Sequence, residues 1–511
     1  MSDFDDVLVV GAGPAGLTTA IELARRGISV RIVDSASGPA TDTRALGMQA
    51  RTLELFERPG LVEPLLDHGL RARVFNVFSE NRQILRADFA QLDSPYPFLL
   101  MIPQNVTERV LADHLAGLGV HVQRRTEVVA VEQTAQHVHA RLRHADGAAS
   151  TATATWLIGA DGAHSTVRHA LGIGFRGEAF EENFAVADLR IDWSLPHDQF
   201  FAFLNRGRFV AYFPMLGGWH RIAVAQPADA VSREHPVTEE ELQAAVDICA
   251  PPGARIDEIR QAGRFRINQR RAEAHARGQV FLVGDAAHIH SVVGAQGMNT
   301  GIGDGFNLGW KLAAVVRGTA PPQLLESYAA ERAPVAERLV RGTRRITRMT
   351  LLRNPVSTAM RRRVAPLVLG RSHVQRTLTR AISQIDVAYH DASGAGPHGR
   401  VAVGDRAPDV EMERIGGVAR LFDLIHPERH TLLGFGSAAA DLGRITEGFT
   451  DMIHPVPVDS AAAAARYRLD GGGLVLIRPD GYVSYVSGDP DPLPLRRHLG
   501  RMFVEEKGDQ T

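Results

Sequence analysis

The feature that most constrains this 511-residue chain is a glycine-rich turn near its first residue. A short apolar run, Asp6–Val10, is followed at once by Gly11-Ala12-Gly13-Pro14-Ala15-Gly16, which has the form G-x-G-x-x-G. The amphipathic stretch Leu17–Arg26 predicts a helix, and a second apolar run, Ile28–Val33, ends at Asp34. A buried strand, a tight turn, a helix and a second strand form the β-α-β unit that binds dinucleotides.

Each position of this motif has a physical role in holding a pyrophosphate. Gly11 permits the tight turn, Gly13 lets the backbone approach the phosphates, and Gly16 lets the helix pack close to the strand. The helix N-terminus offers unpaired N–H groups to an anion. Asp34 lies 23 residues after Gly11, where its carboxylate can hold ribose hydroxyls and disfavours a 2′-phosphate. The site is therefore predicted to bind FAD or NAD rather than NADP.

Two later segments have the pattern of a strand that ends in an acidic turn. The run Trp156–Gly159 leads into Asp161-Gly162 and a helical stretch, and the run Val280–Val283 leads into Gly284-Asp285. An aspartate at such a strand end can accept hydrogen bonds from a sugar-like chain, such as the ribitol of FAD. A simple NAD dehydrogenase needs neither contact, so the pattern favours FAD.

These three motifs, in this order and spacing, resemble those of the class A flavin-dependent aromatic hydroxylases, the group of para-hydroxybenzoate hydroxylase. The resemblance implies an α/β fold with an FAD-binding, doubly wound Rossmann-like domain and an inserted, mostly antiparallel substrate-domain sheet. It covers roughly residues 4–345 and extends through residues 43–47 (TRALG), 103–104 (PQ), 294–301 (GAQGMNTG), 304–312 (DGFNLGWKL) and 328–332 (YAAER).

The resemblance also implies roles for matching residues. Arg44 would neutralise the FAD pyrophosphate, and Gln104 would contact the flavin region. Asp161 would belong to a turn that meets both FAD and NAD(P)H, and Asp285 would bind the ribitol and pyrophosphate. Residues 297–299 would present backbone N–H groups to the flavin, where a helix N-terminus stabilises negative charge. The predicted cofactor-binding residues are Gly11, Gly13, Pro14, Ala15, Gly16, Asp34, Arg44, Gln104, Asp161, Gly284, Asp285, Gly297, Met298 and Asn299.

By this resemblance the chain is expected to be an FAD-dependent monooxygenase that uses NADPH or NADH and O₂. It would hydroxylate an aromatic, polycyclic polyketide-type substrate through a flavin C4a-(hydro)peroxide, and no side chain is predicted as a catalytic acid or base. Baeyer–Villiger oxygenation, a flavin dehydrogenase or reductase without productive use of O₂, and a flavin-binding protein without catalysis remain open alternatives. Val292 stands where the family often has a proline, and this departure supports the dehydrogenase alternative.

The remaining segments predict the domain organisation. Strand-like aromatic patterns indicate the substrate-binding sheet, in which Phe203, Tyr212 and Phe213 either line an apolar pocket or belong to the core. The tail resembles the thioredoxin-like C-terminal domain of the longer phenol and aromatic-polyketide hydroxylases. The predicted parts are residues 1–179 for FAD binding with some substrate-domain strands near 72–100, 180–270 for the sheet, 271–345 for the rest of the FAD domain, 346–399 for a helical segment and linker, and 400–511 for the tail domain.

Composition excludes several classes of function. The formal net charge of −1 gives no reason to expect nucleic acid or an anionic membrane as a partner. The single cysteine, Cys249, excludes an internal disulfide, a Cys-based zinc site and an Fe–S cluster. His288 and His290 lack a third ligand, so no metal site is predicted. We find no apolar run of about 18 residues and no basic leader, and we expect a cytoplasmic protein without a membrane span. The expected partners are the aromatic substrate and O₂, and a homodimer is left open.

Overall fold

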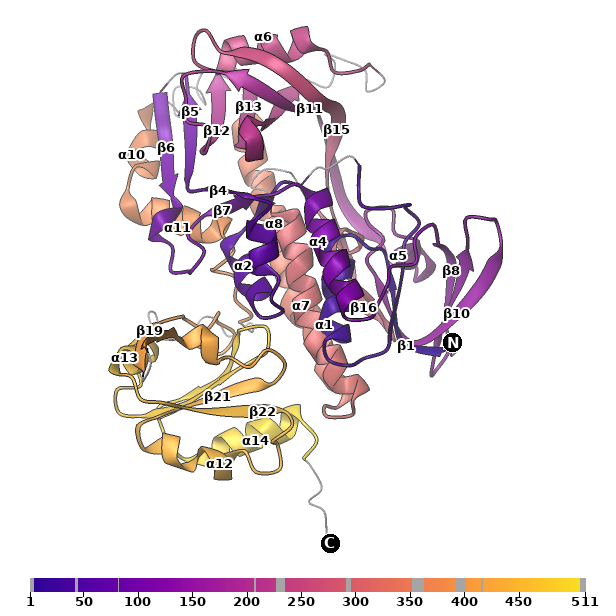
Figure 1. The fold of residues 1–511 in the computed structure, drawn as a ribbon, viewed down its shortest axis with the longest axis vertical. Helices are drawn as coiled ribbons and strands as arrows, with labels where there is room; N and C mark the ends of the chain where they lie inside the picture. Colours follow the sequence, from indigo (N-terminus) through magenta and orange to yellow (C-terminus); the bar gives the residue numbers. More distant parts are fainter. Residues whose placement is uncertain are drawn as a thin grey trace.

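The computed structural model describes residues 4–41, 45–80, 82–205, 208–226, 235–290, 296–351, 363–390, 401–414 and 417–505. Figure 1 shows a central bundle of helices beside the first sheet, a second sheet above it under α6, and the C-terminal part below. Helices and several sheets are mixed along the chain, which is the predicted α/β fold class. Among the described residues, no helix is both long and apolar enough to cross a membrane.

The first sheet has parallel strands at its centre. Its order is β16-β17-β10-β1-β2, and β9 and then β8 extend it by antiparallel pairing. β1 runs parallel to β2 and β10, and β10 runs parallel to β17. Because the carboxyl ends of parallel strands meet at one edge, the turns after β1, β10 and β17 come together there. The strands are β1 (Phe4–Val10), β2 (Val30–Val33), β8 (Glu127–Gln133), β9 (Val138–Arg143), β10 (Ala149–Gly159), β16 (Ala276–Arg277) and β17 (Val280–Leu282).

Helices α1 and α7 pack unusually closely beside this sheet, because α7 carries a glycine at every fourth position of the contact. A Cβ atom at Gly305 would lie 2.8 Å from Oγ1 of Thr19, and one at Gly309 would overlap Cβ of Glu22. The close contact brings the start of α7 to the turn after β17. The helices of this part are α1 (Pro14–Ala24), α2 (Ala50–Glu57), α3 (Val62–Leu66), α4 (Gln104–Gly117), α5 (Thr166–Ala170) and α7 (Gly297–Val316), with a small sheet of β3 (Gly47–Met48), β4 (Leu70–Ala72) and β7 (Leu99–Met101).

The second sheet has eight strands in the order β18-β15-β11-β14-β13-β12-β5-β6. All of its pairs are antiparallel except β12 with β5. Helix α6 (Glu239–Cys249) covers one face. The other face turns toward the first sheet and its helices, which together form the first domain (Figure 1). The strands are β5 (Val74–Ser79), β6 (Arg82–Asp88), β11 (Phe175–Asp192), β12 (Phe200–Asn205), β13 (Arg208–Pro214), β14 (His220–Gln226), β15 (Arg255–Ala272) and β18 (His288–Ile289).

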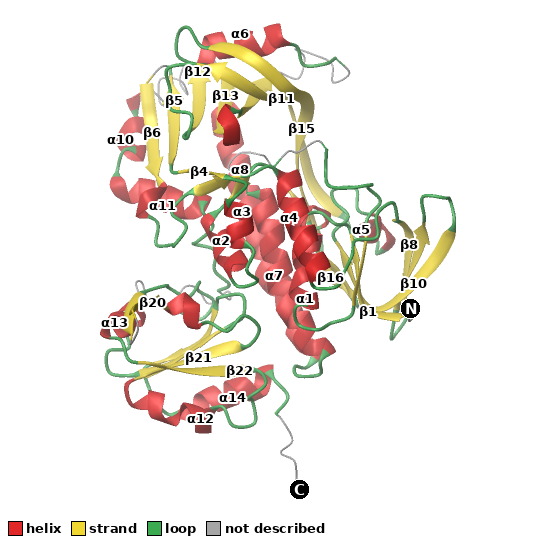
Figure 2. Cartoon of the chain, viewed as in Figure 1, coloured by secondary structure: helices red, strands yellow, loops and turns green. Residues whose placement is uncertain are grey.

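The C-terminal part folds around its own sheet, ordered β22-β21-β23-β24, with β19 and β20 as a separate hairpin. Apolar side chains are buried on both faces of this sheet, and α12 and α14 lie below it in Figure 2. The elements after α7 are α8 (Glu326–Leu351), α10 (Ala365–Leu369), α11 (Ser372–Ile382), β19 (Glu411–Arg414), β20 (Gly417–Arg420), β21 (His430–Phe435), α12 (Leu442–Ile445), β22 (Ile453–Val458), α13 (Ala461–Tyr467), β23 (Gly473–Ile477), β24 (Val483–Ser487) and α14 (Pro492–Met502).

Three of the buried histidines, one in each of the three parts of the molecule, have a strongly lowered pKa. His220 lies against Trp193 at 5.4 Å between ring centroids, and neither of its ring nitrogens has a hydrogen-bond partner among the described residues. His430 is enclosed by aromatic rings, and His275 lies beside His288. Burial lowers the pKa of His220 and of His275 to about 4 and the pKa of His430 to about 3. All three are therefore neutral in the folded protein near pH 7.

The glycine contact between α1 and α7 predicts a position-dependent effect of one substitution. We expect Gly305→Ala to lower the free energy of unfolding by ~1–3 kcal/mol, because the new methyl group collides with Thr19. The matched control is Gly342→Ala in α8, where a Cβ meets nothing within 4 Å and alanine favours the helix. Denaturant unfolding of both variants measures the difference. Equal effects would contradict the close packing.

The buried histidines predict that stability is lost on mild acidification. Each has a lower pKa in the folded state than the value of about 6.5 in the unfolded chain, so the unfolded state binds more protons below pH 6.5. Stability therefore falls as the pH drops from about 6.5 toward 4, by roughly 2 kcal/mol per histidine between pH 7 and pH 5. Unfolding curves at both pH values test this, and His220→Phe should flatten the dependence. A variant that keeps the full dependence would exclude His220 as a cause.

Candidate functional site

The glycine turn after β1 is built by contacts that exclude side chains. Gly11 has a φ of +104°, and a Cβ atom there would overlap the carbonyl oxygen of Ala160. A Cβ atom at Gly16 would overlap the carbonyl oxygen of Gly11, so the helix lies directly on the turn. Gly13 differs, because nothing lies within 4 Å of its Cβ position, and it caps α1 with extended backbone. The open backbone at Gly13 and the helix N-terminus behind it suit a phosphate group.

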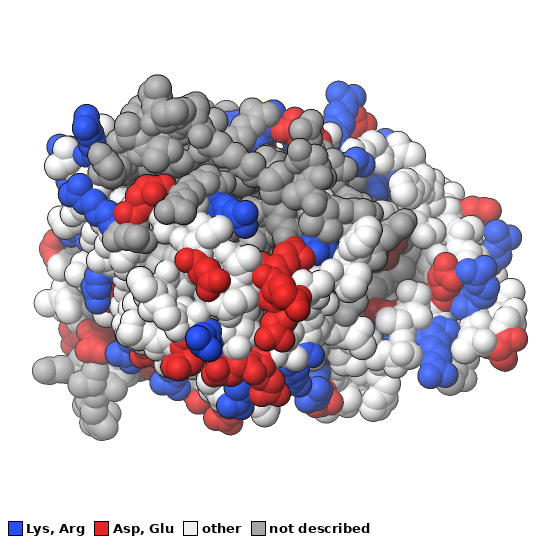
Figure 3. Space-filling view, turned by 90° about the horizontal axis from the view of Figure 1, so that it is seen from above, with Lys and Arg blue, Asp and Glu red and all other residues white. Residues whose placement is uncertain are grey.

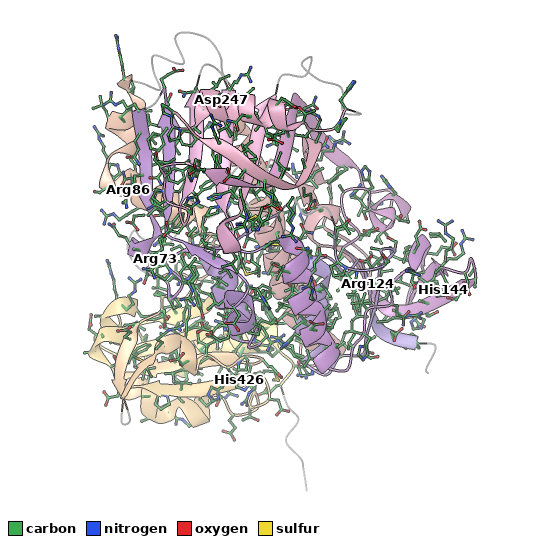
Figure 4. The ribbon with its side chains drawn as sticks, turned by 45° about the horizontal axis from the view of Figure 1, so that its top comes forward. Arg73, Arg86, Arg124, His144, Asp247 and His426 are labelled. Carbon is green, nitrogen blue, oxygen red and sulfur yellow. The ribbon has the colours of Figure 1, made fainter. Side chains whose placement is uncertain are left out.

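A cavity of about 280 Å³ continues from this turn along the edge of the first sheet. Asp34 lines it at the end of β2, and its carboxylate accepts hydrogen bonds from the backbone N–H of Ala12 (2.5 Å) and of Ala36 (2.7 Å). The guanidinium of Arg124, labelled in Figure 4, lies 3.6 Å from the same carboxylate. The lining residues are Val10, Gly11, Gly13, Val33, Asp34, Ser35, Thr126, Glu127, Val128, Ala160, Asp161 and Thr166.

Asp161 lines the same cavity from the end of β10. Its Oδ2 accepts a hydrogen bond from the N–H of Val167 (3.0 Å), in the first turn of α5. Its Oδ1 is buried and has no hydrogen-bond partner among the described residues, and burial raises the pKa of this carboxyl. A buried acceptor without a donor is costly in a folded protein. The cavity is therefore suited to a ligand that carries hydroxyl or N–H donors at this point, as a dinucleotide does.

The turn after β17 is fixed by one buried carboxylate. Asp304, on α7, accepts a hydrogen bond from the N–H of Gly284 (3.0 Å) and contacts Nε2 of His288 (2.7 Å). Its other oxygen accepts from Nε of Arg332 on α8 (2.6 Å). Burial acts to raise the pKa of Asp304, but the guanidinium of Arg332 and the contact with His288 outweigh it and hold this pKa well below its usual range. The next residue in the turn, Asp285, is exposed. Within the described ranges, no group of three or more His, Cys, Asp or Glu could hold a metal ion.

The sequence analysis did not identify this carboxylate network. An aspartate within an apolar helical pattern, followed along the chain by Arg332, is the signal that could have found it. A fully buried charge requires a partner, so an acid in such a pattern predicts a buried cation elsewhere.

The first turn of α7 holds the residues that the sequence predicts to contact the flavin. Residues 297–299 form the first turn, and no side chain caps it. These N–H groups have no partners inside the helix. The side chain of Asn299 fastens α7 to α2, because its Oδ1 accepts from the N–H of Gln49 (2.9 Å) and from Oγ1 of Thr52 (2.7 Å), and its Nδ2 donates to the carbonyl of Gly47 (2.8 Å). The side chain of Asn299 therefore serves to join α7 to α2 and to the strand at Gly47.

Gln104 begins α4 and adjoins the loop that contains Arg44. Its N–H donates to the carbonyl of Ala45 (3.2 Å), and its Nε2 donates to Oε1 of Glu108 (2.8 Å). Arg44 itself lies outside the described residues, as does Val292. The hypotheses about these two residues therefore stay predictions.

For two of the three aromatic residues, the structure favours the core over the pocket, the two alternatives that the sequence left open. Phe203 and Tyr212 are buried in the apolar cluster under α6, on the face of the second sheet that turns away from the first domain. Neither can line a pocket between the sheet and the first domain. Phe213 lies on the opposite face, because successive side chains of a strand alternate. It packs against Phe200 at 4.4 Å between centroids and against the apolar core of the first domain.

The face that carries Phe213 has further residues that sequence reasoning did not single out. Phe75 stacks on Phe200 at 4.3 Å, which extends the aromatic surface to β5. Arg221 forms a buried, two-pronged ion pair with Asp188 (2.7 and 2.8 Å), and it reaches the carbonyl of Ala45 at 3.5 Å. The alternation within β11 and β14 is the signal that could have placed this pair on the inner face.

The outer end of the molecule, above α6, carries charges of both signs. Figure 3 shows acidic side chains gathered near the middle of this face, with basic side chains around them. Three glutamates, residues 239–241, stand in the first turn of α6. The described part of this face therefore has no broad positive field of the kind that attracts nucleic acid.

Known proteins resemble this chain over almost its whole length. The family described as FAD binding domain matches residues 5–343, and the family described as Aromatic-ring hydroxylase, C-terminal, matches residues 400–505. The 6-methylpretetramide 4-monooxygenase of Streptomyces rimosus is 36% identical over 94% of this chain and 91% of its own length. The pentachlorophenol 4-monooxygenase of Sphingobium chlorophenolicum is 34% identical over 94% of this chain and 87% of its own.

Solved structures show the same architecture. The anhydrotetracycline hydroxylase OxyS from Streptomyces rimosus superimposes with a TM-score of 0.81 at 31% identity, over 98% of this chain and 99% of that one. The cofactor cavity, the two family matches and these relatives agree with the motifs that first suggested FAD. The chain belongs to the FAD-dependent aromatic-ring hydroxylases, and it is a flavin-dependent monooxygenase.

Proposed function

We propose that this enzyme hydroxylates a polycyclic aromatic substrate of the polyketide type, with NADPH or NADH as the reductant. The observation that carries the proposal is the aromatic inner face of the second sheet, where Phe75, Phe200 and Phe213 form a continuous surface toward the first domain. Flat aromatic rings bind such a surface by stacking. The named relatives that act on 6-methylpretetramide and on anhydrotetracycline support a substrate with several fused rings.

Different residues of the chain would bind different parts of FAD. Gly13 and the first turn of α1 would bind the pyrophosphate with Arg44, and Asp34 would bind the adenosine ribose. Asp161 and Asp285 would hold the sugar-like chain, since both stand at the edge where the parallel strands end. The first turn of α7 would stabilise negative charge on the reduced flavin. Bound FAD supplies the redox chemistry that activates O₂.

The second sheet would hold the substrate and exclude water. Its inner face is anchored at Arg221, whose ion pair with Asp188 is buried and whose guanidinium reaches the loop at Ala45. A water-poor space would favour transfer of oxygen to the substrate over its loss as hydrogen peroxide. Residence in a reducing cytoplasm, where NAD(P)H is available, belongs to the same proposal.

The decisive experiment follows the oxygen atom. The enzyme with FAD is incubated with NADPH, isotopically labelled O₂ and aromatic compounds that range from phenols to tetracyclic quinones, and the products are analysed by mass spectrometry. We expect one labelled oxygen in a polycyclic product, attached to a ring carbon. A labelled lactone would indicate that the enzyme carries out Baeyer–Villiger oxygenation and not hydroxylation. NADPH consumption that yields only peroxide with every compound would contradict the proposed substrate class.

The oxygen of Asp161 that lacks a hydrogen-bond partner predicts that its substitution weakens FAD binding but not the stability of the FAD-free protein. We expect Asp161→Asn to weaken FAD binding about tenfold or more, because a carboxylate accepts stronger hydrogen bonds than an amide. The FAD-free protein should lose little stability, because the amide keeps an acceptor for the N–H of Val167 and the change affects an oxygen, Oδ1, that has no hydrogen-bond partner among the described residues.

Titration of the apoprotein with FAD and unfolding curves without FAD measure the two effects. The control is Asp304→Asn, which should reduce both FAD affinity and stability because it leaves Arg332 buried without its partner. If Asp161→Asn behaved like Asp304→Asn in both measurements, Asp161 would be a structural residue and not a cofactor contact.

A further inference from the structure

A small cavity lies where α2, α7, α8 and the C-terminal domain meet. Its volume is about 20 Å³, which gives room for one or two particles of the size of water. Polar side chains from all of these parts line it, among them Arg51, Arg332, Gln384, Tyr389 and Asp480. The cavity therefore lies at the junction of the cofactor domain and the C-terminal domain.

The ion pairs around this cavity form three separate groups, and one of them has more cations than carboxylates. Arg332 pairs with Asp304. The two cations Lys311 and Arg478 pair with the two carboxylates Glu331 and Asp480, so these first two groups balance. In the third group, Arg51 and Arg406 share a single carboxylate, that of Glu54. Arg51 lines the cavity, so the unbalanced cation lies at its wall.

A sixth cation approaches the same place. Arg58 donates to the carbonyl of Pro479 (2.6 Å), and Arg51 donates to the carbonyl of Asp480 (2.7 Å), so two guanidinium groups converge on one turn. Burial and the proximity of Arg51 lower the pKa of Arg58 to about 10. Like charges held together away from water are costly unless an anion or solvent compensates them.

The polar atoms near the cavity also favour an acceptor as its occupant. Nε of Arg51 is buried and has no hydrogen-bond partner within the described part of the chain. The Tyr389 hydroxyl accepts a hydrogen bond from Arg332 (3.0 Å), so its own proton is available to donate. The carboxylate of Asp480, by contrast, already accepts from Arg478. The lining therefore offers donors and positive charge.

We propose that this cavity binds one monovalent, monatomic anion of the size of chloride. The anion neutralises the excess positive charge at the domain interface and stabilises the contact between the C-terminal domain and α7. Water could fill the same volume, but it would leave the excess positive charge uncompensated. The anion is a structural ligand, and its binding depends on neither the identity of the substrate nor turnover.

The test uses the FAD-loaded enzyme in solutions of constant ionic strength, in which sodium chloride replaces sodium gluconate, whose anion is too large for the cavity. We expect the melting temperature to rise with chloride by about 2 °C for each tenfold increase above half-saturation. Crystals soaked in sodium bromide should show an anomalous scattering peak between Arg51 and Tyr389. No chloride-specific stabilisation together with no bromide peak would overturn the proposal in favour of water.

Two variants connect the response to this cavity. Gln384→Glu places a carboxylate in the lining and should reduce the apparent chloride affinity at least tenfold while the enzyme stays folded. Arg420→Gln is the control, because Arg420 pairs with Glu57 (2.8 Å) at the same domain interface but outside the cavity. It should keep the chloride response of the parent enzyme. A response that Gln384→Glu leaves unchanged would place the anion elsewhere and overturn the assignment.

Discussion

The arrangement of the cofactor site depends on the buried carboxylate of Asp304. A turn that leaves a parallel strand has no sheet partner to fix it, so the turn at Gly284 needs a bond from outside the sheet. Asp304 supplies that bond from α7 and is itself held by Arg332 from α8. A buried charge that loses its partner costs about 3–5 kcal/mol. The ion pair therefore opposes any displacement of the Gly284 turn, α7 and α8 relative to one another more strongly than apolar packing alone would. The glycine contacts between α1 and α7 complete this arrangement, since they set how near the first turn of α7 comes to the glycine turn of β1.

One turn of α8, which contains Glu331 and Arg332, joins the first domain to the C-terminal domain. Glu331 and Arg332 are neighbours in α8, and they bond in different directions. Arg332 holds Asp304 beside the cofactor turn, whereas Glu331 pairs with Lys311 and, in two-pronged fashion, with Arg478 of the C-terminal sheet (2.7 and 2.9 Å). A displacement of the C-terminal domain would therefore act on α8 at the position that fixes the cofactor turn. This domain has no cysteine for disulfide chemistry, and the ion pairs give it a physical role as a support for the flavin site.

The sequence predicted the family and the fold class, because the motifs that indicate them lie in consecutive residues. The glycine turn, the carboxylate at Asp34 and the acidic strand ends at Asp161 and Asp285 are local patterns, and the resemblance they carried gave the family and the fold class. The sequence left open what tertiary contacts decide. The side of the sheet that Tyr212 occupies depends on strand register, and a shift of one residue exchanges the two faces. The partner of Asp304 lies 28 residues away on another helix. The apolar pattern around Asp304 indicates that a cation must pair with it, but the pattern does not give the position of that cation.

If the inner face of the second sheet holds the substrate, as proposed, the alternation of its strands would separate substrate recognition from folding. Outward residues such as Tyr212 pack under α6 and maintain the sheet, whereas inward residues such as Phe213 pack toward the first domain. A change on the inner face can alter the shape offered to a substrate while the outer cluster keeps the strands in register. The cofactor edge of the first sheet is untouched by such changes, because its polar contacts come from strand ends and from α7. A scaffold divided in this way can accept different aromatic ring systems with one set of flavin contacts.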